Sequence, residues 1–224
     1  VLGLGLEAGS CLRVALDSFV LQNDPGEFRR YVAEAHDRAI PQLQLEDRES
    51  GGRQSLNSLV SFRYLAFSLA AGNFDDAWEM AEALANGIER RLGGHGWVDA
   101  MGQFFIYLTL NDLDRVRHAA SQVDRLEPSV AGSAIAYARL ARAIVARSQS
   151  DAARAVEAVL AAHPIDCGEG WHFEYWVSGQ IVCAYGLAMV NAAAMHGFRV
   201  PLNGDVQIPE PLVIVPPESG PTPE

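Results

Sequence analysis

The sequence predicts an all-α protein built from antiparallel helical hairpins that stack into a bundle or a short, tetratricopeptide-like solenoid. Apolar residues recur at helical spacing along most of the chain. Short polar turns containing Gly, Asn or Pro separate these segments, as they do in helical hairpins. Similar turn sequences also recur near residues 72, 111 and 148, which indicates a faint internal repeat.

In the N-terminal half, helices are expected at residues 11–21, from Pro25 to Ile40, at 55–71 and at 74–92. Asp24 is placed to cap the second of these, and Pro25 suits a first helical turn. The polar run over residues 46–54 contains Ser-Gly-Gly and indicates a loop. Apolar positions Ala77, Met80, Ala81 and Leu84 follow the spacing of one buried helix face.

In the C-terminal half, helices are expected at residues 97–110, 113–126, 130–146, 151–162 and 173–196. His163-Pro164 closes the fourth, and Gly197 ends the fifth. Residues 198–200 should be extended, and the prolines beyond them form a Pro-rich extended tail without regular helix. The apolar run 212–215 is expected to pack back on the helices.

The repeat compares residues 72–77, 111–116 and 148–153, whose starts are separated by 39 and 37 residues. This period lies between the ~34 residues of a tetratricopeptide repeat and the ~40–47 of HEAT-type repeats. It is explained either by degenerate repeats or by an ordinary bundle of similar helices. Both explanations predict stacked hairpins without a sheet core.

Length and composition indicate one large domain. Of the 224 residues, 49% are hydrophobic, which is enough for a sizeable core. We expect a single domain over residues 1–218 and a flexible tail over 219–224. No apolar run reaches the ~20 residues of a membrane helix. The first 21 residues lack the basic start and the unbroken apolar region of a secretory signal.

Charge and cysteine content narrow the range of partners and compartments. The net charge of −11 disfavours nucleic acid and anionic membrane surfaces as partners. The acidity either attracts a basic protein partner or only keeps the chain soluble. The three cysteines, Cys11, Cys167 and Cys183, form no CxxC pair, so a reducing cytoplasm is expected.

Three groups of residues could carry chemistry, and each has a structural explanation. Gly3 and Gly5 suggest a glycine-rich turn but lack the rest of a phosphate loop. His163, Cys167 and His172, with acids nearby, match no zinc spacing. The acids at 75, 76, 79 and 82 lie in the first turns of a helix, where acids stabilise the helix dipole. We therefore expect no enzyme, no cofactor and no metal.

The most unusual segment, residues 166–176, combines acids, two glycines and four aromatic residues. Aromatic side chains beside charges are typical of protein-binding hot spots. Alternatively, Trp171, Phe173 and Trp176 begin a helix and pack inward. The expected partner-binding residues are Asp75, Asp76, Glu79, Asp166, Glu169, Trp171, His172 and Glu174.

Residues 181–213 carry a long Ala-rich helix, then Met-His-Gly-Phe-Arg-Val at 195–200 and Ile-Pro-Glu-Pro-Leu-Val at 208–213. This segment, about one-seventh of the chain, resembles the C-terminal end of a family of all-α immunity proteins from bacterial polymorphic toxin systems. The resemblance implies tight binding and neutralisation of a cognate toxin in a contact-dependent or type VI secretion setting. It implies no catalytic residues.

Three hypotheses follow. The first is an immunity protein, whose acidity suits a basic toxin such as a nuclease. The second is a helical-repeat scaffold or secretion adaptor/chaperone with a concave groove. The third is an enzyme on an α-bundle, which would need a deep polar pocket.

Overall fold

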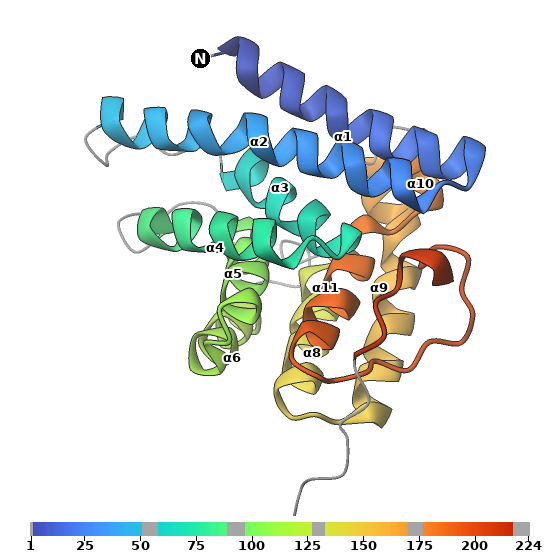
Figure 1. Cartoon of the computed structure of the whole chain (residues 1–224). Helices are drawn as coiled ribbons and strands as arrows, with labels where there is room; N and C mark the ends of the chain where they lie inside the picture. The colour runs from blue at the N-terminus through green and yellow to red at the C-terminus, as the bar shows by residue number, and fades with distance from the viewer. Residues whose placement is uncertain (1, 51–57, 89–96, 127–132, 170–176, 217–224) are drawn as a thin grey trace, which may run out of the picture.

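A computed structural model of the chain describes residues 2–50, 58–88, 97–126, 133–169 and 177–216. The regular elements within these ranges are all helices, which confirms the predicted fold class (Figure 1). None of the described helices combines the length and the apolar character that a membrane span requires. The predicted flexible tail, residues 219–224, lies outside the described ranges.

In the described ranges, four pairs of consecutive helices form hairpins, and two further helices and a 3₁₀ turn follow them. The elements are α1 (Leu2–Gln22), α2 (Pro25–Ser50), α3 (Ser58–Ala71), α4 (Phe74–Ile88), α5 (Trp97–Thr109), α6 (Leu113–Val123), α8 (Ala134–Val145), α9 (Gln149–Glu169), α10 (Val177–Ile181), α11 (Ala184–Met195) and η2 (Glu210–Leu212).

Three of the hairpins turn in the same way. Gly72, Asn111 and Arg147 each adopt a left-handed conformation, with φ of +73°, +56° and +52°. In each turn the next amide bonds back to a carbonyl five residues earlier, at 2.8–2.9 Å, which is the Schellman arrangement that ends a helix. The repeat is thus structural, and its third member starts at Arg147, one residue before the predicted start at Ser148.

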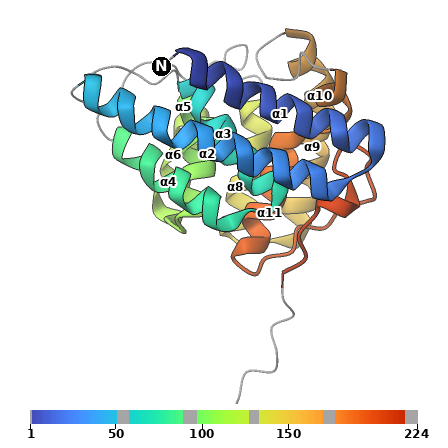
Figure 2. The same ribbon diagram turned by 45° about the horizontal axis from the view of Figure 1, so that its top comes forward.

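Helix α11 fills the inner side of the stack. It packs against α3, α5 and α8, the first helices of three hairpins, and α5 adjoins both α3 and α8. Every residue of α11 except Met195 is buried, so the helix meets protein on all sides. Figures 1 and 2 show α1 and α2 lying across the remaining helices, with α11 among α3, α8 and α9.

Residues 198–216, called here the C-terminal strap, cover α11 after a left-handed Gly197 (φ +69°). Phe198 and Val200 are buried in a segment without helix, as predicted. Leu212 is buried and Val213 packs against the core, so the apolar run does return to the helices. The Gln149 side chain holds this strap to α9 by donating to the Arg199 carbonyl at 3.2 Å.

Two sequence predictions in the N-terminal half are wrong. Helix α1 begins at Leu2 rather than residue 11, so Gly3 and Gly5 lie in a helix and not in a glycine-rich turn. Helix α2 continues to Ser50, through Pro41 and into the predicted loop at 46–54. The long α1–α2 contact supports both extensions, because tertiary packing outweighs the local cost of Gly and Pro.

Two predictions in the C-terminal half are also wrong. Helix α9 does not stop at His163-Pro164 but continues to Glu169. The single helix expected over 173–196 is instead interrupted between α10 and α11. At the break, Cys183 has a non-helical ψ of 80°, and its amide donates to the Gln207 carbonyl of the strap at 2.8 Å. A long-range hydrogen bond thus replaces a helical one.

Candidate partner-binding surface

Helix α4 presents an acidic outer face. Its predicted inner face is confirmed, because Ala77, Met80, Ala81 and Leu84 are all buried. The helix carries four carboxylates and no basic residue. Asp75, Glu79 and Glu82 are exposed at helical spacing, so they line one side of the helix, while Asp76 is half-buried beside them.

Trp78 adds a large aromatic ring to this face. Its exposed fraction is 39%, and its indole N–H donates to the Glu82 carboxylate at 3.0 Å. That bond orients the ring along the helix before any partner arrives. A rigid, partly exposed Trp among carboxylates has the composition of a binding hot spot. Sequence reasoning missed Trp78, although its position outside the apolar spacing of α4 was a usable signal.

The name acidic face is used below for Asp75, Trp78, Glu79 and Glu82. A second residue that sequence reasoning missed, His36 of α2, lies directly behind it. Its side chain is 5% exposed, with Nε2 3.9 Å from Glu79 and Nδ1 3.8 Å from Asp37. Neither ring nitrogen makes a hydrogen bond. Asp37 is 83% exposed, so it extends the carboxylate surface from α4 onto α2.

Two arginines of α2 are bonded to acids of their own helix. Arg30 donates to Glu27 at 2.6 Å and also lies beside Glu34, and Arg38 pairs with Glu34. The hydrogen bond from Arg30 lowers the pKa of Glu27 below its ordinary value, and the same bond raises the pKa of Arg30. The carboxylates bonded to Arg30 are thus Glu27 and Glu34 of α2.

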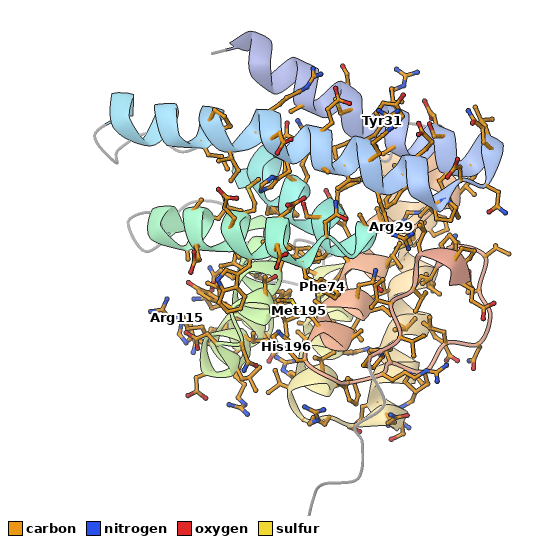
Figure 3. All side chains as sticks on the ribbon, viewed as in Figure 1. Arg29, Tyr31, Phe74, Arg115, Met195 and His196 are labelled. Carbon is orange, nitrogen blue, oxygen red and sulfur yellow. The ribbon has the colours of Figure 1, made fainter. Side chains whose placement is uncertain are left out.

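Arg29, a third arginine of α2, points elsewhere. Its guanidinium donates to the Ala71 carbonyl at 3.1 Å and lies 3.4 Å from the Pro211 carbonyl, so it joins the end of α3 to the strap (Figure 3). Its charge therefore supports the fold at a helix C-terminus, where cations are favourable.

The second group of predicted residues lies outside the described part of the structure, except for the backbone of two members. Asp166 and Glu169 lie on the last turns of α9, and their side chains are outside the described part of the structure. Trp171, His172 and Glu174 are outside it altogether. Helices α4 and α9 lie on opposite sides of the molecule in Figures 1 and 2.

The histidine and cysteine group predicted near residue 163 is only partly described. His163 is a buried residue of α9, Cys167 lies on the same helix, and His172 is outside the described ranges. Within those ranges, no three His, Cys, Asp or Glu side chains are arranged to hold a metal ion.

The concave side of the hairpin stack is occupied. Repeat proteins commonly bind partners along such a surface. Here α11 lies on it, and the two residues that follow α11 are bonded to the end of α5 and to the turn after α8. His196, labelled in Figure 3, has Nε2 2.6 Å from the Leu108 carbonyl. Arg147 donates to the Gly197 carbonyl at 2.9 Å. A carbonyl only accepts, so His196 Nε2 carries the proton.

The described structure thus defines a class: an all-α protein of stacked helical hairpins, closed by its own helix α11, with an acidic outer face on α4. No protein family, curated protein or solved structure matches the chain.

Proposed function

We propose that this protein binds a basic protein partner through the acidic face of α4, and that the partner is a cognate bacterial toxin that it neutralises. One observation carries the proposal: α4 combines four carboxylates, no basic residue and a partly exposed Trp78 held by Glu82. Such a surface steers a cationic protein by charge and offers an aromatic anchor at contact.

The toxin as partner rests on the resemblance of residues 181–213 to the immunity family. The described structure of this segment is compatible with it. The helix ends at Gly197, an extended piece follows, and the Pro-rich element forms the turn η2. The buried cysteines Cys11 and Cys183 suit a reducing compartment, where a toxin would be met after entry.

The stacked hairpins favour a second candidate, a scaffold or secretion adaptor. An adaptor of this architecture would receive a peptide on its concave side. Because α11 covers that side, the partner of an immunity protein or of an adaptor would bind an outer surface such as the acidic face. We therefore place the immunity function first.

The experiment is a capture from the native organism on three baits: the wild type, a Trp78→Ala/Glu79→Arg variant, and an Asp114→Arg control. Asp114 is an exposed acid on α6, so the control makes a similar charge change on another helix. The proposal expects one stoichiometric basic partner on wild type and control after a high-salt wash, and its loss from the α4 variant.

The captured protein is then expressed alone and together with this chain. Growth arrest that co-expression relieves, and that the α4 variant fails to relieve, supports neutralisation. Equal retention on all three baits would move the interface away from α4. Several weakly held secretion components in place of one toxic partner would favour the adaptor.

A further inference from the structure

A cavity of about 220 Å³ lies between α11 and the C-terminal strap. Its walls are mostly aliphatic side chains from both elements. They include Val190, Ala194, Val200, Leu202, Ile208 and Ile214. An apolar cavity of about 150 Å³ is large enough to take up benzene. The space under the strap therefore fits a branched aliphatic group of several carbons.

Two opposite charges also line this cavity. Arg199 and Glu210 are exposed residues of the strap that line it beside the aliphatic side chains. In the described part of the chain, neither side chain makes a hydrogen bond or an ion pair, with the other or with a third residue. The backbone of Arg199 is held by Gln149 at 3.2 Å, so its position is fixed while its guanidinium is unpaired.

We propose that this cavity binds a small zwitterion with a branched aliphatic side chain, that is, a free aliphatic α-amino acid. The side chain would fill the aliphatic space, the carboxylate would meet Arg199, and the ammonium would meet Glu210. A fatty acid would leave Glu210 beside a second anion, and an aliphatic amine would leave Arg199 beside a second cation. A ligand with both charges places an opposite charge beside each residue.

Binding at this place would also act on the strap. The cavity is bounded by both ends of the strap and by α11, so a ligand there joins three segments. The amides of Val213 and Ile214 are hydrogen-bonded at 3.1 and 2.9 Å in the same wall. A ligand that holds this wall closed slows their exchange with solvent. The proposal is independent of the acidic face on α4.

The test is calorimetric titration of the full chain with L-leucine, L-isoleucine and L-valine. Saturable binding is expected for at least one. Weaker or absent binding is expected for 4-methylpentanoate, which lacks the ammonium, and for 3-methylbutylamine, which lacks the carboxylate. Arg199→Gln and Glu210→Gln should each raise the Kd about tenfold or more, because each removes a charge-assisted hydrogen bond. Both residues are exposed, so both variants should fold.

Hydrogen exchange with and without the amino acid locates the site, and slowing is expected within residues 198–215. A cavity-filling variant, Ala194→Leu, should abolish binding, with its melting curve as the check on folding. The proposal is overturned if none of the three amino acids binds saturably at millimolar concentration. It is equally overturned if both charge variants bind as the wild type does, or if the slowing falls elsewhere in the chain.

Discussion

Asn191 Oδ1 accepts the main-chain N–H of Ile214 at 2.9 Å, and this bond joins the most buried helix to the C-terminal strap. The Asn191 amide nitrogen lies 3.0–3.1 Å from three carbonyl oxygens, those of Leu69, Ala70 and Leu212. The residue is fully buried. One side chain thus satisfies carbonyls at the end of α3, which a helix leaves unpaired, and fixes the strap on both sides of Val213.

Asn191→Ala should lower the free energy of unfolding by about 3 kcal/mol or more, because it leaves several buried main-chain groups without partners. Urea denaturation of the wild type and the variant measures this loss. Asn203→Ala is the control, since Asn203 is an exposed strap residue that donates only to Glu157 at 2.9 Å. Asn203→Ala should change the free energy of unfolding by no more than about 0.5 kcal/mol. Similar losses for both variants would contradict the role assigned to Asn191.

Gly72→Ala should destabilise the fold for two separate reasons. The residue has φ of +73°, which disfavours any side chain, and an added Cβ would lie 2.7 Å from the Ile214 Cδ1 atom. We expect a loss above the ~1 kcal/mol that a left-handed conformation alone costs. Thermal or urea unfolding measures it.

Gly204→Ala measures the loss of stability that comes from the left-handed backbone conformation alone. Gly204 has φ of +75°, but no atom lies within 4 Å of an added Cβ. The Gly204→Ala variant should lose about 1 kcal/mol of unfolding free energy, less than Gly72→Ala loses.

The double variant Gly72→Ala/Ile214→Ala tests the steric part of the Gly72 effect. Without the Ile214 side chain, that part of the loss of stability should disappear. If the stability losses of Gly72→Ala and Ile214→Ala simply add in the double variant, the Ile214 side chain makes no steric clash with residue 72.

His36→Leu should leave the protein equally stable or raise its free energy of unfolding by about 1 kcal/mol, because it removes a buried polar ring without hydrogen bonds. His196→Leu is the matched comparison, since its ring lies 2.6 Å from the Leu108 carbonyl. That variant should be destabilised. A clear loss of stability in His36→Leu at pH 8 would mean that the ring does have a partner in solution.

Asp151 should contribute to the acid sensitivity of the fold. Hydrogen bonds from Ser148 and Arg154 lower its pKa below the ordinary value of 3.8. The ionised carboxylate therefore stabilises the folded state above pH 3.8, and this contribution is lost as the pH falls through the lower, folded pKa.

Asp151→Asn and Ser148→Ala should both make stability less dependent on pH in that acidic window, which acid unfolding curves will reveal. Ser148→Ala should have an effect because the Ser148 hydroxyl is the largest cause of the shift. An NMR titration of Asp151 in the Ser148→Ala variant should show its pKa returning toward 3.8. An unchanged titration would contradict this assignment.

Local signals predicted many elements correctly because their causes are local. Asp24 caps α2 by accepting amide bonds from Gly26 and Glu27 at 2.9 and 3.0 Å, as its position before Pro25 indicates. The buried face of α4 follows from helical spacing alone. His36 behind Glu79 could not be predicted in this way. These residues are on different helices, and no sequence pattern sets the distance between two helix faces.

The sequence by itself determined that the chain is helical, where most hairpins turn, and that α4 has an acidic outer side. These features depend on residues within a few positions of one another. Only the tertiary structure decided that α9 continues past Pro164, that a helix breaks at Cys183, and that α11 fills the concave side. Each of these depends on contacts between distant segments, such as the bond from Cys183 to Gln207, whose energy outweighs local preference.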